Sequence, residues 1–318
     1  MKTFCDPVFA EGLKDIVSSF DAFVIDQWGV IHDGKQVFPG VVDALEHISA
    51  LGKPSVIVTN SAKGNAYNKK RLAGLGVSRA LYTDLVSSAE VMRSSLVGRK
   101  EAPWDSLGDK AFLIANEEDR GFLSGTKYKS VGTIEEADFV LLLSTKKDTP
   151  SSAHEVWIDV AVERKLPVFS ASADPLTFGP EGIFSGSAGI LKAIEAKGHT
   201  VINTGKPHRL VYERCSQLLT GIKPKKVLAI GDQIATDIIG AKLFGFRAAL
   251  IMGGASERLF EAAVSPNDAV RIARDLVEPH LLPDFLLPGL RWTGGSVAPF
   301  RRTTVFQNLQ EFFGKPDP

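Results

Sequence analysis

Four residues of the sequence have the side chains that the handling of a phosphate group requires. Asp26 ends the apolar run AFVID, and Asp232 follows the run VLAIG. A carboxylate can attack phosphorus, but a cation must offset the repulsion between the two anions. Thr59 offers a hydroxyl to a phosphoryl oxygen, and Lys206 supplies a positive charge that stabilises a bound phosphate and the developing transition state. These residue types predict phosphoryl transfer, with Asp26 as nucleophile and Asp232 as cation ligand.

The segments around these residues alternate between strand and helix patterns. Apolar runs at 22–27 and 55–59 predict buried strands, and the apolar spacing of 41–51 predicts a helix between them. Strand, helix and strand at this spacing predict a parallel sheet with helices on both faces. The same alternation returns in the second half of the chain. We expect a helix at 207–219, a strand at 226–230, a helix at 236–244 and a strand at 247–252.

A long interval separates these two halves. A crossover between neighbouring parallel strands needs only a dozen or more residues, so an interval of this length predicts an inserted domain. We therefore expect an α/β protein with a doubly wound, Rossmann-like parallel-sheet core at 1–84 and 201–318, and an α/β domain inserted at 85–200. Its expected strands lie near 111–114, 139–143 and 168–170, and its helices near 87–96, 154–164 and 188–197. The tail at 283–318 is not placed by its pattern.

Composition excludes several classes of partner. Lys plus Arg and Asp plus Glu both number 37, so no basic excess favours nucleic acid or an anionic membrane. The 318 residues contain two cysteines and no apolar run near the ~20 residues that span a bilayer. We expect a cytoplasmic protein whose partner is a small phosphorylated metabolite, and the sequence leaves a homodimer open.

Four short segments resemble the ordered motifs of a known superfamily. They are VIDQWGV at 24–30, VTNSA at 58–62, GKPH at 205–208 and GDQIATD at 231–237. Together they are similar to the motifs of the haloacid dehalogenase-like (HAD) phosphohydrolases, and in detail to subfamily IIA, which contains p-nitrophenyl-phosphatase-like and sugar-phosphatase-like members. Each motif alone is weak, but four in the right order are specific.

The resemblance implies a role for each matching residue. Asp26 corresponds to the nucleophile that forms an aspartyl-phosphate, Thr59 to the phosphate-binding hydroxyl and Lys206 to the charge-balancing lysine. Asp232 corresponds to a ligand of the family's Mg²⁺, and Asp237 to a second acid that supports the metal.

Further residues are implied in substrate binding. Asn60 and Ser61 correspond to the turn that shapes the phosphate site. The inserted domain corresponds to the family's cap, and within it SASADPL at 170–176 resembles a divergent Asn-Pro-Asp stretch that keeps Asp174.

Trp28 departs from the family pattern. Most members have a second Asp two residues after the nucleophile, where it acts as general acid and base. An indole has no titratable proton, so we expect the ring to pack or to line the substrate pocket. The backbone carbonyl of Trp28 still corresponds to a metal ligand. General acid–base catalysis contributes about 10²–10⁴-fold in rate, so this DxWGV variant predicts slow turnover.

Simpler interpretations exist for the same residues. Asp26 or Asp232 could cap a neighbouring segment, and Lys206 could be a solvated lysine at a helix start.

Three functions stay open. The first is a magnesium-dependent phosphohydrolase, and the second is a non-catalytic phosphometabolite-binding or regulatory protein on the same fold. The third is a phosphotransferase in which Trp28 shields the aspartyl-phosphate from water.

Overall fold

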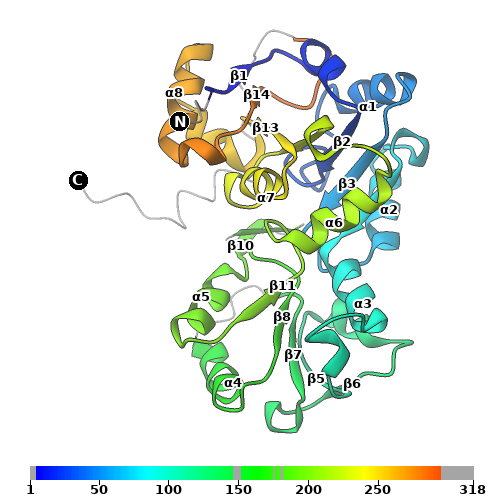
Figure 1. The fold of residues 1–318 in the computed structure, drawn as a ribbon, viewed down its shortest axis with the longest axis vertical. Helices are drawn as coiled ribbons and strands as arrows, with labels where there is room; N and C mark the ends of the chain where they lie inside the picture. Colours follow the sequence, from blue (N-terminus) through cyan, green and yellow to red (C-terminus); the bar gives the residue numbers. More distant parts are fainter. Residues whose placement is uncertain (1–4, 146–151, 175, 180–181, 295–318) are drawn as a thin grey trace.

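A larger and a smaller α/β part lie along the long axis of the computed structural model, which describes residues 5–145, 152–174, 176–179 and 182–294 (Figure 1). The larger part is built on a seven-stranded, all-parallel sheet in the order β1-β14-β13-β12-β2-β3-β4. Its strands are β1 (Val8–Phe9), β2 (Ala22–Asp26), β3 (Ser55–Thr59), β4 (Asp84–Ser87), β12 (Val227–Gly231), β13 (Arg247–Ile251) and β14 (Phe285–Leu287).

Helices cover both faces of this sheet, as the sequence predicted. Along β2, Phe23 and Ile25 pack into one core cluster, and Ala22 and Val24 pack into another on the opposite face. The first cluster includes helices α1 (Val41–Ala50) and α2 (Asn65–Gly74), and the second includes α6 (Arg209–Leu218), α7 (Ile239–Phe244) and α8 (Pro266–Leu276). Every residue of β2, β3 and β12 is buried, which explains their nearly continuous apolar runs.

The smaller part is a second parallel sheet with its own core. Its strand order is β11-β8-β7-β5-β6, and an antiparallel hairpin, β9 with β10, precedes its last helix. The strands are β5 (Lys110–Ile114), β6 (Lys129–Val131), β7 (Phe139–Leu142), β8 (Val168–Ser170), β9 (Leu176–Gly179), β10 (Gly182–Ser185) and β11 (Val201–Asn203), and the helices are α3 (Ser88–Gly98), α4 (Ser152–Glu163) and α5 (Ala188–Ala196).

Sheet membership shifts the expected domain boundaries. Strand β4, which the prediction assigned largely to the insertion, pairs with β3 in the core sheet. Strand β11, which the prediction assigned to the core, pairs with β8 in the second sheet. A boundary drawn from helix and strand patterns cannot tell which sheet a short strand joins. We therefore propose an inserted domain at 88–203.

The C-terminal tail contributes one strand to the core. Strand β14 lies between β13 and β1, and the chain then runs back along the N-terminal segment, where Leu13 N–H donates to the carbonyl of Arg291 (2.8 Å). The ring of Trp292 stacks on His47 of α1. The rest of the predicted tail, 295–318, lies outside the described residues. Within the described part of the chain, no helix has the length and apolar character needed to cross a membrane.

Candidate active site

The predicted site residues meet where neighbouring strands of the core sheet end. Strand β2 lies between β12 and β3, with Ile25 paired to Ile230 and Asp26 paired to Val58. Because parallel strands present their carboxyl ends at one edge of the sheet, Asp26 and Asp232 lie side by side at that edge. Lys206 approaches the same edge from the segment between β11 and α6.

One ammonium joins two of the carboxylates. Lys206 Nζ donates to Asp26 Oδ1 and, at 2.7 Å, to Asp237 Oδ1. All three side chains are buried. Burial alone would lower the pKa of Lys206, but Asp237 and Asp26 raise it well above its ordinary value, so the ammonium stays charged. Within the core, therefore, a fixed positive charge lies directly beside the predicted nucleophile.

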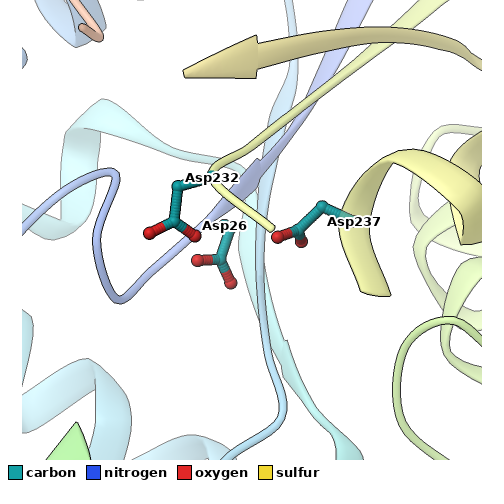
Figure 2. A group of neighbouring side chains, drawn as sticks. All are labelled: Asp26, Asp232 and Asp237. Carbon is teal, nitrogen blue, oxygen red and sulfur yellow. The ribbon is translucent and has the colours of Figure 1, made fainter. Parts of the chain in front are cut away.

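Three carboxylates form a cluster that suits a divalent cation. One oxygen from each of Asp26, Asp232 and Asp237 lies within 4.8 Å of the others, and Figure 2 shows the three groups gathered around one point. Burial raises the pKa of Asp26 to about 7, against the lowering effect of Lys206. Burial also raises the pKa of Asp232 well above its ordinary value, and the charges of Asp26 and Asp237 add to this. A cation would offset this surplus of negative charge.

The hydrogen bonds of Asp232 test whether the carboxylate cluster suits a divalent cation. Its Oδ2 accepts a hydrogen bond from Ala255 N–H (2.6 Å), but its buried Oδ1 has no hydrogen-bond partner among the described residues. A buried carboxylate oxygen without a partner is costly. Oxygen donors without sulfur or imidazole are the set that Mg²⁺ and Ca²⁺ prefer. The residues present therefore fit a hard divalent cation.

Two glycines that the sequence analysis did not single out allow this arrangement. Gly29 has φ +81° and Gly254 has φ +60°, and a Cβ on either would lie 1.8 Å or 2.2 Å from Asp232 Oδ2. Only glycine lets both loops approach the carboxylate this closely. The sequence shows the glycines, but the approach depends on a three-dimensional contact that no spacing reveals.

Comparison with known proteins assigns the family. A model described as haloacid dehalogenase-like hydrolase matches residues 23–129, and a HAD-hydrolase-like model matches residues 203–279, together more than half of the chain. This chain is a HAD-like hydrolase. Its relatives and structural neighbours, which include a p-nitrophenyl phosphatase, indicate subfamily IIA.

Relatives of this HAD-like hydrolase match along most of its length. Chronophin from Rattus norvegicus is 24% identical over 79% of this chain and 82% of its own. Sugar-phosphatase AraL from Bacillus subtilis is 25% identical over 81% and 94%. A HAD-like hydrolase structure from Brucella suis has TM-score 0.72 at 24% identity, covering 89% of this chain and 100% of its own. A Mycobacterium tuberculosis glycerol phosphate phosphatase in complex with magnesium has TM-score 0.63 at 22% identity, covering 85% and 76%.

Asn60 links three segments of the hydrolase. Its side-chain amide donates to Asp174 Oδ1 (2.8 Å) in the inserted domain and to the carbonyl of Lys206 (3.0 Å), and its Oδ1 accepts from Lys206 N–H (2.7 Å). Gly205 makes this possible, because a Cβ there would lie 2.5 Å from both Asn60 Oδ1 and the carbonyl of Ala171. The predicted residue Asp174 is thus brought to the site by a contact between the two parts of the chain.

Thr59 and Ser61 flank Asn60 at the end of β3. The Thr59 side chain is buried, and its hydroxyl has no hydrogen-bond partner in the part of the chain that the structure describes. Ser61 Oγ accepts from Lys63 N–H (3.1 Å), which closes the turn. The free hydroxyl suits a phosphoryl oxygen, whereas the Ser61 side chain serves the turn itself.

The ring of Trp28 packs rather than offering an acid. It lies 4.7 Å from the ring of His32, edge to face, and the guanidinium of Arg71 lies over it at 5.1 Å. A Cβ on Gly34 would lie 2.6 Å from the indole. The position where the resemblance implies an acid is therefore occupied by an aromatic ring that lies between His32 and Arg71.

His32 lies beside Trp28 with both of its ring nitrogens in contact with neighbouring residues. The residue is fully buried, Gly34 N–H donates to its Nδ1 (2.9 Å), and its Nε2 lies 3.0 Å from the side-chain amide nitrogen of Gln27. Burial, with a further contribution from Arg71, lowers the pKa of His32 to about 4. Both ring nitrogens are used to hold the loop that follows Asp26.

Proposed function

We propose that this HAD-like hydrolase is a magnesium-dependent phosphatase that hydrolyses a small phosphorylated metabolite through an aspartyl-phosphate on Asp26. The observation that carries the proposal is the shared ammonium of Lys206, which donates to Asp26 and Asp237. A nucleophilic carboxylate beside fixed positive charge and a cation site is what phosphoryl transfer to Asp needs. The names of relatives, among them a sugar phosphatase and a glycerol phosphate phosphatase, support the same reaction class.

The proposed reaction proceeds by two successive displacements at phosphorus. A carboxylate oxygen of Asp26 bonds to phosphorus while the bond from phosphorus to the substrate's leaving oxygen breaks. Water then attacks the aspartyl-phosphate, releasing inorganic phosphate and restoring the carboxylate. Lys206 and the Thr59 hydroxyl stabilise phosphoryl oxygens, and N–H groups of the turn at Asn60 and Ser61 hold another. Since Trp28 has no titratable group, the leaving oxygen takes its proton from solvent, which makes turnover slow.

The metal site follows from the carboxylate cluster. Asp26, Asp232 and the backbone carbonyl of Trp28 would hold Mg²⁺, with Asp237 supporting the cation or its waters. When bound, the cation offsets the repulsion between the nucleophile and the phosphate. The M. tuberculosis glycerol phosphate phosphatase has structures in complex with magnesium and with calcium, which supports a divalent cation at this site.

The inserted domain limits the size of the substrate. Asp174 reaches the Asn60 amide, which also holds the main chain of Lys206, so this domain lies directly over the charged cluster. A domain that closes over a site excludes water and admits compact ligands. We therefore assign a small phosphorylated metabolite rather than a phosphoprotein as the substrate class.

A screen of phosphorylated metabolites with Mg²⁺ tests the proposal, with wild type and Asp26→Asn run side by side. We expect wild type to release phosphate from p-nitrophenyl phosphate and from at least one small metabolite, and Asp26→Asn or EDTA treatment to abolish release. Full activity in Asp26→Asn would remove Asp26 as nucleophile. Absence of release from every compound would overturn the enzymatic assignment.

The packing of Trp28 favours one rival, a non-catalytic protein that binds a phosphorylated ligand. The ring fills the place of the usual acid, held by His32 and Arg71. The two functions differ in one measurement. A binding protein would show a rise in melting temperature with a phosphorylated metabolite and Mg²⁺ but no phosphate release, and the rise would persist in Asp26→Asn.

A further inference from the structure

Asp237 lies in an unusual turn of the backbone. The sequence predicts an α-helix at 236–244, but the structure has a π-helical turn at Ile234–Ile238 and begins α7 at Ile239. In this turn the N–H groups of Asp237 and Ile238 both donate to the carbonyl of Gln233 (2.9 and 3.3 Å). Single π turns are rare and frequently lie at functional sites, because the wider turn re-aims a side chain.

Tyr212 contacts this turn from helix α6. Its side chain is buried, with 1% of the residue exposed, and its hydroxyl lies 3.0 Å from the carbonyl of Thr236 and 3.1 Å from that of Asp237. A phenol has one proton to donate, so the two carbonyls share it. Gly240 of α7 packs closely against the Tyr212 side chain, since a Cβ at Gly240 would lie 2.6 Å from the Tyr212 oxygen and 2.7 Å from Cα of Pro207.

One segment therefore holds Asp237 at two points. Lys206, just before α6, donates from Nζ to the Asp237 carboxylate at 2.7 Å. Tyr212, near the start of the same helix, donates to the Asp237 main chain. The remaining carboxylate oxygen, Oδ2, accepts from Gln233 N–H (3.1 Å). The direction of the Asp237 carboxylate thus depends on the turn that the Tyr212 hydroxyl contacts.

We propose that Tyr212 is a positioning residue of this active site: its hydroxyl holds the π turn so that the Asp237 carboxylate faces Lys206 and the predicted cation. The inference rests on the proposed function, since it assigns Tyr212 to the same metal-supported site. Removal of a group that orients a metal-binding carboxylate typically lowers metal affinity or activity by about 10–100-fold.

The replacement Tyr212→Phe removes the hydroxyl and keeps the ring that packs against Phe244 and Phe246. A matched control is available in the inserted domain, where the buried hydroxyl of Tyr128 donates to the carbonyl of Leu96 (2.9 Å) far from the charged cluster in sequence and in a separate core. Tyr128→Phe removes a similar buried donor, together with the hydrogen bond that Arg99 Nη1 donates to the same hydroxyl (3.2 Å). Both variants are expected to melt at a lower temperature than wild type.

Metal binding separates the two variants. Calorimetric titration of Mn²⁺, without substrate, is expected to give about 10-fold or weaker affinity in Tyr212→Phe and wild-type affinity in Tyr128→Phe. With substrate, Tyr212→Phe is expected to need about 10-fold more Mg²⁺ for half activation. Wild-type Mn²⁺ affinity in a folded Tyr212→Phe would overturn the proposal. Because this titration needs no turnover, it measures the effect of the hydroxyl even if the metabolite screen finds no phosphatase activity.

A rescue experiment tests the hydrogen bond itself. Replacement of Tyr212 by p-aminophenylalanine restores a donor at the same place on the ring. We expect this variant to regain most of the Mn²⁺ affinity lost in Tyr212→Phe. If the folded amino variant binds Mn²⁺ as weakly as Tyr212→Phe, donation to the π turn is not the cause and the proposal fails.

Discussion

The side-chain amide of Asn60 donates to Asp174 across 2.8 Å, which joins the core sheet directly to the inserted domain. The same amide group also donates to the carbonyl of Lys206, and its oxygen accepts from Lys206 N–H. The placement of the inserted domain and the placement of the site lysine therefore depend on one side chain.

Removal of Asn60 should affect catalysis more than removal of Asp174. A hydrogen bond to a charged group contributes about 1.5–3 kcal/mol, so Asp174→Ala is expected to raise KM about tenfold by loosening the inserted domain. Asn60→Ala is expected to lower kcat about tenfold as well, because Lys206 N–H loses its partner. Steady-state kinetics on both variants checks this. Equal effects of the two changes on kcat would contradict a separate role for Asn60.

Trp28→Asp is expected to raise kcat by at least tenfold for alkyl phosphates. The substitution supplies the acid that this position lacks, and such an acid contributes about 10²–10⁴-fold. The gain should be smaller for p-nitrophenyl phosphate, whose leaving group needs little protonation. Trp28→Asn is the control, because Asn has nearly the same size as Asp but cannot donate a proton as an acid. A similar gain in both variants would mean that loss of the ring, not proton transfer, causes the change.

Gly29→Ala is expected to abolish the rise in melting temperature that Mg²⁺ causes in wild type, because the added Cβ would lie 1.8 Å from Asp232 Oδ2. Gly52→Ala is a matched control, since Gly52 also has positive φ (+66°) but nothing within 4 Å of a Cβ. The control should lose about 1–2 kcal/mol from backbone strain and keep the Mg²⁺ response. Differential scanning fluorimetry with and without EDTA measures both. Retention of the response in Gly29→Ala would place the cation elsewhere.

The two cysteines should differ in reactivity. Burial raises the pKa of the Cys215 thiol to about 12, whereas Cys5 is exposed. Since the thiolate is the nucleophile, native protein at pH 8 should react with one equivalent of a thiol reagent and denatured protein with two. Between about pH 9 and pH 12 only the unfolded state loses the Cys215 proton, so stability should fall as pH rises, and less so in Cys215→Ala. Two reactive thiols in the native state would contradict the burial.

Much of the core could be predicted from the sequence because its strands are buried on both faces. Runs such as 22–27 and 55–59 are apolar throughout, and the polar residues that end them stand out. The carboxyl ends of neighbouring parallel strands lie together at one edge of the sheet, so the sequence alone predicts that Asp26 and Asp232 meet.

Other features depended on contacts that a linear pattern does not contain. The π turn at Ile234–Ile238 differs from an α-helix by one residue per turn and is stabilised by Tyr212, 24 residues away in sequence from Thr236. Strands β4 and β11 are short, and only pairing decides their sheets. Strand β14 has three residues, which is too few for periodicity to separate from a loop.

The two connections between the core and the inserted domain run next to each other. Thr204 Oγ1, in the second connection, donates to the carbonyl of Ser88 (3.0 Å), where the first connection enters α3. Two adjacent connections lead us to expect that the inserted domain would rotate about a single axis through them, and that such a rotation would break the Asn60–Asp174 hydrogen bond. A rotation of this kind would expose the buried ammonium of Lys206 and the three buried carboxylates to a substrate without requiring the strands of the core sheet to move.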